Sequence, residues 1–322
     1  MDNIYFNFIF ILFINILIFF NLEFLSKKIN ILDYPDKKRK LHKYPVPLIG
    51  GVILSINFLV LAFLFKNISN DILSIFYFSL IFFLVGLLDD KFHISPNKKF
   101  LLNTIILLTF FWLNQNFLIK QFNFFNTTFE FNFLISFMFS VICVLIFINA
   151  MNLFDGINLQ SLIYTINIFI FLSIKNYQNA YLLIIILILC SLIYFNYKNK
   201  LFLGDSGIYL LSSFISLNII YIHNIEQKIV ADEIFLLMMV PGIDMLRLFI
   251  YRLLNKKNPF YGDRMHIHHL LLDKYGYKAA ITIIFFMISI PIFLNLLIDT
   301  RVIILSFILI YSCLIFFLKK IN

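Results

Sequence analysis

Long runs of Ile, Leu and Phe recur along the chain at nearly even spacing, with short polar segments between them. Each run approaches the ~20 residues that a helix needs to cross ~30 Å of hydrocarbon. The pattern predicts an all-α, polytopic membrane protein, with residues 1–322 in a single transmembrane domain. The eleven expected spans cover about residues 4 to 25, 48 to 66, 71 to 88, 100 to 119, 132 to 151, 159 to 174, 178 to 197, 207 to 222, 231 to 253, 279 to 297 and 300 to 318.

The amino-acid composition supports this interpretation. Of the 322 residues, 61% are hydrophobic and 13% are charged, against ~25% charged in an ordinary soluble domain. A water-soluble core is therefore excluded. The three cysteines lie in separate apolar runs, a spacing that suggests neither a disulfide framework nor a zinc site. The first run lacks a basic flank and a small-residue cleavage site, so we expect it to remain as the first span.

Basic residues are unevenly divided between the two sets of loops. Cytoplasmic loops retain Lys and Arg. With the N-terminus outside, the inner loops and the C-terminal tail hold twenty of them, the outer loops hold five, and Arg247 lies within a span. This predicts an outer N-terminus and a cytoplasmic C-terminus. The net charge of +9 then describes the inner face of a membrane protein rather than a nucleic-acid-binding surface.

Candidate chemistry follows the same division, because five of the six His and most of the acidic motifs fall on the inner loops near 26–47, 89–99, 152–158, 198–206 and 254–278. The first of these loops joins a cluster of cations to prolines and a glycine pair, which suits either a rim that grips anions or a simple positive-inside anchor. On the outer side, residues 120–132 alternate polar and aromatic side chains and could form a short hairpin or an interfacial belt.

Two adjacent carboxylates, Asp89 and Asp90, end an apolar run. They are costly in hydrocarbon and repel each other, so a metal, phosphate chemistry or plain solvation must account for them. Asn152 and Asp155 share one side of a helix if the helix extends that far, although an Asn-rich cap is the alternative. Asp205 stands in a Gly-Asp-Ser-Gly turn that can bring backbone amides close to an anion or cap the next helix.

Three histidines, His266, His268 and His269, follow Arg264 in the last inner loop. They could bind zinc, but the Cys or carboxylate partners at finger spacing are missing, and the cluster better suits diphosphate or sugar hydroxyls. Within the ninth run, Asp244 and Arg247 stand three residues apart. That spacing predicts a structural ion pair on one helical face beneath the site.

Five motifs in order resemble those of the polyprenyl-phosphate N-acetylhexosamine-1-phosphate transferases, glycosyltransferase family 4, over residues 33 to 270. They are Asp33-x-Pro to Pro45-x-Pro47-x-x-Gly50-Gly51, Asp89-Asp90, Asn149-x-x-Asn152-x-x-Asp155-Gly156, Phe202-x-Gly204-Asp205-x-Gly207, and Pro259-Phe260 to Asp263-Arg264-x-His266-x-His268-His269. The resemblance implies that Mg²⁺, or Mn²⁺ in its place, supports transfer of a sugar phosphate from a UDP-N-acetylhexosamine to undecaprenyl phosphate. UMP would be released on the cytoplasmic side of the cell membrane, and a homodimer is compatible with this activity.

The resemblance also assigns roles to individual residues. Asp205 is similar to the main metal ligand, with Asn152 and Asp155 beside it, and Lys99 resembles the cation that meets the lipid phosphate. Asp89 or Asp90 would position or deprotonate that phosphate. The nucleotide pocket would comprise Lys43, Asn158, Asn196 and Phe202, with Phe202 stacking on the base, and the loop over the diphosphate and sugar would comprise Arg264, His266, His268 and His269.

The chain departs from the family pattern at one turn. Bacterial members commonly read Asp-Gly-x-Asp-Gly-Leu where this chain reads Asp155-Gly-Ile-Asn158-Leu159-Gln160. An Asn at 158 can still hydrogen-bond a uracil edge. The absence of glycine at 159 leaves the conformation of the turn open.

Other functions fit the sequence less well. A transporter would place ionisable groups at a midplane site between related halves, whereas these charges lie at the inner ends and no repeat is evident. A structural membrane scaffold leaves the one-sided motifs unexplained. Within the family, the alternative is the peptidoglycan branch that uses UDP-N-acetylmuramoyl-pentapeptide. The histidine pattern favours the branch that initiates O-antigen, common-antigen or teichoic-acid glycans, with GlcNAc or a rarer N-acetylated deoxyhexosamine as the sugar.

Overall fold

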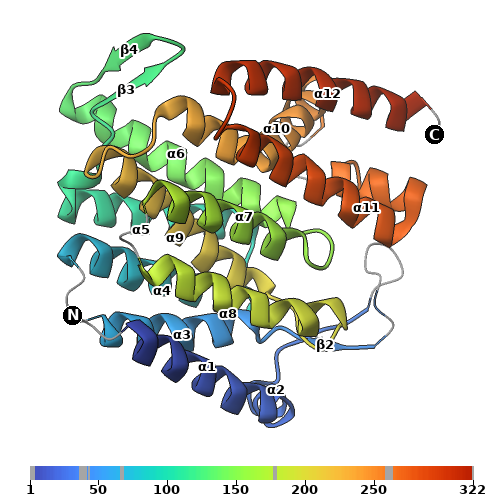
Figure 1. Ribbon diagram of the computed structural model, residues 1–322. Helices are drawn as coiled ribbons and strands as arrows, with labels where there is room; N and C mark the ends of the chain where they lie inside the picture. The colour runs from blue at the N-terminus through green and yellow to red at the C-terminus, as the bar shows by residue number, and fades with distance from the viewer. Residues whose placement is uncertain are drawn as a thin grey trace.

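The computed structural model describes residues 4–35, 42, 44–65, 69–176, 180–257 and 264–320, and these form a helical bundle with two short antiparallel strand pairs (Figure 1). The helices are α1 (Ile4–Phe20), α2 (Leu22–Ile29), α3 (Gly50–Leu64), α4 (Asn70–Phe92), α5 (Pro96–Leu113), α6 (Phe133–Phe154), α7 (Gln160–Lys175), α8 (Ala180–Tyr197), α9 (Gly204–Asn224), α10 (Ala231–Leu254), α11 (Ile267–Leu294) and α12 (Thr300–Lys320). The strands are β1 (Leu32–Asp33), β2 (Val46–Pro47), β3 (Gln121–Phe124) and β4 (Thr127–Glu130).

Length and composition make seven of the described helices able to cross a membrane: α4, α6, α8, α9, α10, α11 and α12. The number becomes eight if α1 and α2, which meet at a 68° bend, form one span. The apolar helices α3 and α7 are shorter. Each predicted apolar run contains a described helix, and the all-helical membrane class is confirmed at the level of these candidate spans.

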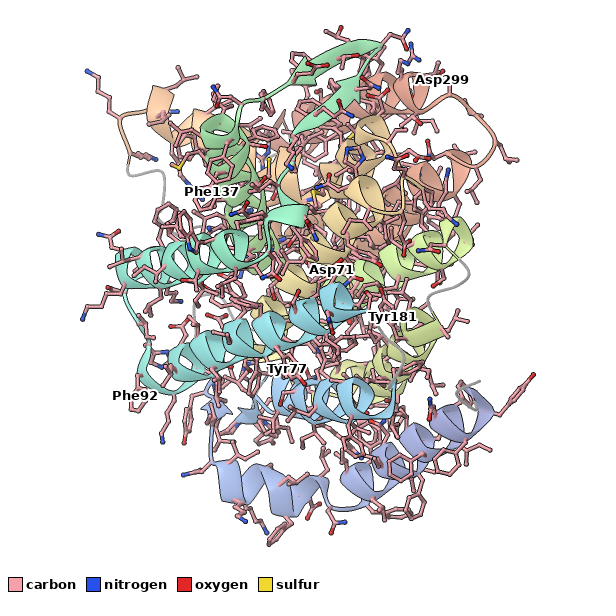
Figure 2. All side chains as sticks on the ribbon, turned by 90° about the vertical axis from the view of Figure 1, so that its left-hand side faces the viewer. Asp71, Tyr77, Phe92, Phe137, Tyr181 and Asp299 are labelled. Carbon is pink, nitrogen blue, oxygen red and sulfur yellow. The ribbon has the colours of Figure 1, made fainter. Side chains whose placement is uncertain are left out.

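Helix α9 is the centre of the bundle. Its residues from Ser206 to Ile222 are buried without interruption, and α3, α4, α6 and α7 pack around it. The three serines at 212, 213 and 216 donate their hydroxyls to carbonyls of the preceding turn. These bonds satisfy polar groups that would otherwise be costly in an apolar interior. Figure 2 shows side chains filling the spaces around α4, with Asp71 and Phe92 at its two ends.

Of the two alternatives for residues 120–132, a hairpin or an interfacial belt, the structure shows the hairpin. Strands β3 and β4 pair antiparallel, and the rings of Phe122 and Phe129 stack across them with centroids 5.0 Å apart. The backbone N–H of Phe125 at the turn donates to Asp232 on α10 at 3.0 Å. The hairpin stands at the end of the bundle opposite β2 (Figure 1).

The first inner loop, near residues 26–47 and called loop one below, is followed by the start of α3, and backbone hydrogen bonds join this region to the segment before α9. Phe202 donates its N–H to Pro47 at 3.0 Å and accepts from Gly50 at 2.9 Å, and Gly51 donates to Leu203 at 3.0 Å. These bonds hold the segment from β2 to α3 beside residues 202–203, although about 150 positions separate them in sequence.

Two further features concern α10 and α11. The predicted pair of Asp244 and Arg247 is confirmed, with 2.7 Å between the Arg247 Nη2 and Asp244 Oδ1 atoms. Tyr311 of α12 also donates to Asp244 at 2.8 Å. Helix α11 is interrupted at Gly276, whose φ of +75° is non-helical. The part before this kink belongs to the end of the bundle that holds the loop motifs, and the later part matches the predicted run.

Glycines permit the close approach of α4 and α3 to the start of α9. A Cβ at Gly86 would lie 2.4 Å from the Asp205 carbonyl oxygen and 2.5 Å from the Ser206 Cα. At Gly51 it would lie 2.3 Å from the Ser206 Oγ. Neither contact is possible without moving backbone or a buried side chain.

We predict that Gly86→Ala lowers both the thermal stability and the activity of the purified protein. Overpacking of this kind typically costs about 1–3 kcal/mol, and here it displaces the first turn of α9. The matched control is Gly242→Ala in α10, where nothing lies within 4 Å of the added carbon. Thermal unfolding should show a lower midpoint for the first variant only, and equal midpoints for both would contradict the close packing.

Candidate active site

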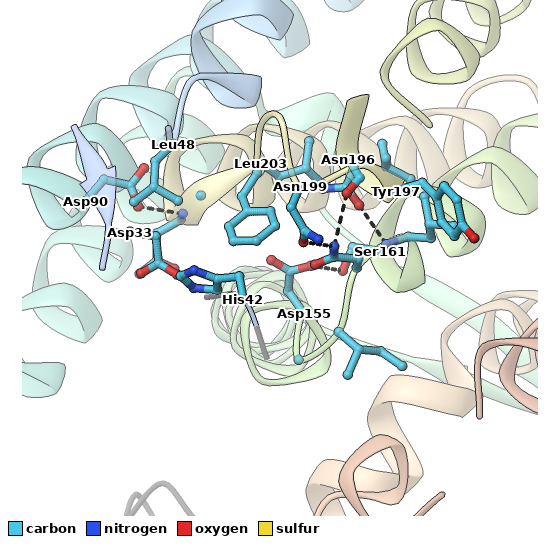
Figure 3. A pocket seen from close by; sticks show the side chains of 18 of the residues that line it. Asp33, His42, Leu48, Asp90, Asp155, Ser161, Asn196, Tyr197, Asn199 and Leu203 are labelled. Carbon is cyan, nitrogen blue, oxygen red and sulfur yellow. Dashed lines mark hydrogen bonds and ion pairs between the residues drawn. The ribbon is translucent and has the colours of Figure 1, made fainter. Parts of the chain in front are cut away.

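A cavity of about 1340 Å³ opens at the end of the bundle that carries the loop motifs. Figure 3 shows Asp33, His42 and Asp90 towards one side of it, and Asn196, Asn199 and Tyr197 towards the other. Nine of the site residues predicted from the sequence line this cavity: Asp89, Asp90, Lys99, Asp155, Asn158, Asn196, Phe202, Asp205 and, at the start of α11, His269.

Asp90 caps the N-terminus of α9. Its two carboxylate oxygens accept the backbone N–H groups of Asp205 at 2.8 Å and Ser206 at 3.0 Å. Gly204 precedes them with a φ of +70°, and a Cβ there would lie 2.5 Å from the Asp90 Oδ2. A negative charge at a helix N-terminus is favourable because unpaired N–H groups point at it. Asp90 thereby determines where Asp205 sits.

Asp89 lies next to Asp90 but has different partners. Its side chain is only 3% exposed, it forms a close ion pair with Lys99, and it accepts the backbone N–H of Ile94 at 2.8 Å. The hypothesis of a solvated helix end therefore fails for Asp89. The Lys99 Nζ also lies 3.3 Å from the Asp205 Oδ2. Although partial burial favours neutral lysine, the charges of Asp205 and Asp89 raise the pKa of Lys99 above its ordinary value.

Two polar residues from the end of α6, Asn152 and Asp155, lie near Asp205. Asn152 on α6 donates its Nδ2 to the Asp205 Oδ1 at 3.1 Å. Asp155, at the end of α6, accepts the Ser161 hydroxyl at 2.7 Å. The recess withdraws bulk water from Asp155 and, with the charges of Asp205 and Asp90, raises the pKa of its carboxyl to about 7 against the opposing bond from Ser161. This environment therefore disfavours a further negative charge on Asp155.

Oxygen ligands suited to Mg²⁺ are present, but a complete protein cage is not. Among the described residues, no group of three His, Cys, Asp or Glu side chains is placed to hold a metal ion. Mg²⁺ is usually held by one or two carboxylates, with waters and substrate phosphates completing its shell. Asp205, with Asn152 and Asp155 nearby, fits that incomplete donor set.

The structure shows how the turn at 156–159 forms without a glycine at position 159. Leu159 adopts a left-handed conformation with φ +69°, which costs an L residue roughly 1–2 kcal/mol. Asn196 compensates by accepting the Leu159 N–H at 2.7 Å and donating to the Leu201 carbonyl at 3.2 Å. Asn196 thus holds the turn that carries Asn158.

Loop one contributes two residues that the sequence did not single out as site residues. His42 lies 2.9 Å from Asp33 through its Nε2 and 2.8 Å from the Tyr44 carbonyl through its Nδ1. Its ring meets Phe202 edge-on, with centroids 5.3 Å apart. The Asp33-x-Pro motif was the sequence feature that could have identified Asp33 as a site residue. Lys43, predicted for the nucleotide pocket, lies outside the described residues, as does Asp263.

The three clustered histidines stay in ring contact, with centroids 5.5 Å apart for His266 and His268 and 4.3 Å apart for His268 and His269, but they face different partners. His269 lines the cavity, whereas His266 bonds Asp244 at 2.7 Å. His268 is 1% exposed and packs beneath Gly156, where a Cβ would lie 1.8 Å from its Nε2. Arg264 pairs with Asp273, another residue of the cavity wall.

Known proteins are similar to this chain over much of its length. A protein from Thermotoga maritima named undecaprenyl-phosphate alpha-N-acetylglucosaminyl 1-phosphate transferase is 30% identical over 277 residues, which are 86% of this chain and 84% of its own. The family model described as glycosyl transferase family 4 matches residues 72–223. The chain belongs to glycosyl transferase family 4. It is thus a phospho-sugar transferase of that family, and its resemblance to the family is confirmed.

Two further relatives illustrate the range of family 4. A Bacillus subtilis protein named as a probable undecaprenyl-phosphate N-acetylglucosaminyl 1-phosphate transferase is 26% identical over 76% of this chain and 70% of its own. A phospho-N-acetylmuramoyl-pentapeptide-transferase from Streptococcus sanguinis is 29% identical over 54% of this chain and 59% of its own. The family match contains Asp89, Asp90, Asp155 and Asp205.

Proposed function

We propose that this family 4 enzyme transfers N-acetylglucosamine-1-phosphate from UDP-N-acetylglucosamine to undecaprenyl phosphate, giving the lipid-diphospho-sugar and UMP and initiating a cell-surface glycan. The observation that carries the proposal is the meeting of Lys99, Asp89 and Asp205 in one cavity, with Asn152 hydrogen-bonded to Asp205. The Thermotoga relative, which aligns with most of this chain, is named for transfer of N-acetylglucosamine 1-phosphate to undecaprenyl phosphate, and this supports the choice of sugar and lipid.

The proposed chemistry is a single displacement. An oxygen of the lipid phosphate attacks the β-phosphorus of the UDP-sugar, the bond from that phosphorus to the bridging oxygen breaks, and the bridging oxygen leaves with UMP. A phosphomonoester with a second pKa near ~6 is already largely an anion, so orientation matters more than a strong base. Lys99 offers the cation that holds this anion.

The two aspartates then support the reaction from different positions. Both oxygens of Asp90 are engaged by backbone N–H groups, which favours a positioning role over service as a covalent nucleophile. Asp89 orients Lys99 through their ion pair. Mg²⁺, or Mn²⁺ in its place, would be held by Asp205 with Asn152 and Asp155 and, when bound, neutralises diphosphate charge.

The second candidate within the family is transfer from UDP-N-acetylmuramoyl-pentapeptide. The Streptococcus relative is named for that activity, but it aligns with only about half of this chain. The pentapeptide branch therefore remains the alternative to be tested with its own donor.

The proposed topology has eleven crossings, with α1 and α2 counted as one, the N-terminus outside and the cavity facing the cytoplasm of the cell membrane. The excess of basic residues in the loops on the cavity side supports it. So does Figure 1, in which α1 begins at the end opposite the one where α12 ends. The helices α3 and α7 have 15 and 16 residues, and local thinning of the bilayer accommodates short spans.

An assay of the purified enzyme with undecaprenyl phosphate and a panel of UDP-sugars tests the activity. We expect UDP-N-acetylglucosamine to give lipid-diphospho-sugar and UMP in the presence of Mg²⁺, detected by mass spectrometry. Chelation should abolish product, and Asp205→Ala should lower the rate by ~10²-fold or more because a main ligand is lost. Product from the pentapeptide donor alone would replace the proposal, and undiminished turnover of Asp205→Ala would remove its metal role.

Reporter fusions test the topology. A reporter placed after Lys66 should be outside and one placed after Lys99 should be cytoplasmic, because α4 is expected to cross between them. Both reporters on the same side would refute the eleven-span arrangement and the cytoplasmic cavity together.

A further inference from the structure

Asn199 terminates α8 and projects its side chain into the cavity wall. Its φ is +53°. The Lys200 N–H bonds the Phe195 carbonyl at 2.8 Å, and the Asn199 N–H bonds the Asn196 carbonyl at 3.1 Å. This pair of bonds ends many helices, and the left-handed residue within it is usually Gly and sometimes Asn. The turn therefore fixes the Asn199 backbone but does not require its amide.

A chain of hydrogen bonds determines which way that amide faces. The Asn196 carbonyl can only accept, so the Asn158 atom that lies 3.0 Å from it must be Nδ2. The same Nδ2 lies 2.6 Å from the Asn199 side chain, so the Asn199 atom facing it must be the acceptor Oδ1. The NH₂ group of Asn199 is thereby turned away from Asn158.

Two groups at this end of the cavity remain available to a ligand. Within the described part of the chain, neither the Asn158 Oδ1 nor the Asn199 Nδ2 has a hydrogen-bond partner. An acceptor and a donor thus stand on neighbouring side chains. Both residues line the same cavity as Phe202, whose ring is the predicted stacking surface for a base.

We propose that Asn199 is a specificity residue that, with Asn158, selects uracil over cytosine in the nucleotide donor. Uracil presents a carbonyl acceptor at C4 beside an N3–H donor. The C4 carbonyl matches the side-chain Nδ2–H donor of Asn199, and the N3–H matches the Oδ1 acceptor of Asn158. Cytosine presents an amino donor at C4 beside an N3 acceptor, so both contacts would be mismatched. The proposal rests on the proposed function, because it assumes a uridine nucleotide in this cavity.

Substitution by glycine separates base recognition from helix termination. Asn199→Gly keeps the left-handed turn, and the lower cost of glycine at φ +53° offsets the lost bond from Asn158, so its thermal midpoint should stay close to that of the wild type. The loss of one neutral hydrogen bond should raise the KM for the UDP-sugar and weaken inhibition by UMP by about 2-fold to 10-fold. We expect kcat to change less.

Substitution by aspartate tests the polarity of the contact. Asn199→Asp retains an acceptor for Asn158 but turns an oxygen towards the C4 position of the base. Inhibition by UMP should weaken by about tenfold or more, while inhibition by CMP weakens less, so the preference for UMP narrows. The matched control is Asn30→Gly at the end of α2, where φ is +51° and the residue is outside the cavity, and its kinetics should match the wild type.

The outcomes separate this proposal from the proposed function. The proposal is overturned if the wild type is active and both Asn199→Gly and Asn199→Asp keep the wild-type KM and preference for UMP over CMP. Asn199 would then be a turn residue only. A wild type that neither forms product from any UDP-sugar nor binds UMP would overturn the proposed function and this proposal with it.

Discussion

The cap that Asp90 places on α9 determines the geometry of the whole site. Bonds of 2.8 and 3.0 Å satisfy two N–H groups at the start of the most enclosed helix, where an unpaired donor would be costly. Asp205 then faces Lys99, and the segment just before α9 accepts the N–H groups of Gly50 and Gly51. The Asp90 carboxylate therefore joins α4 to the start of α9, and backbone bonds to residues 202–203 hold loop one beside that junction.

Local sequence patterns anticipated the parts of the fold that depend on neighbouring residues. Apolar runs gave the helices, the alternation at 120–132 gave a hairpin, and three-residue spacing gave the pair of Asp244 and Arg247. Contacts between residues far apart in sequence could not be predicted from such local patterns. The adjacency of Asp89 and Asp90 was evident, but not that one binds a lysine side chain while the other binds backbone 115 positions away.

The same distinction applies within the site. The motifs identified many of the polar residues that line the cavity. Residue type alone did not show which of them face a ligand and which hold neighbouring backbone in place. Asn196 was predicted to bind the nucleoside, and the fold uses its amide to hold Leu159 in a left-handed turn. Asn199 gave no sequence signal because Asn is common throughout the chain. The orientation of its amide depends on hydrogen bonds from Asn158 to the Asn196 carbonyl and to Asn199. These bonds form only when the end of α8 and the 156–159 turn lie side by side.

The most direct test of the central role of Asp90 is the thermal unfolding of Asp90→Asn beside the wild type. The amide can accept at only one atom and turns its NH₂ towards a backbone N–H, so the cap is half lost. A cap contributes about 0.5–2 kcal/mol, and we predict a midpoint lower by about 2–4 °C together with reduced turnover. An unchanged midpoint accompanied by lost turnover would contradict the account, because Asp90 would then act on the substrate rather than on α9.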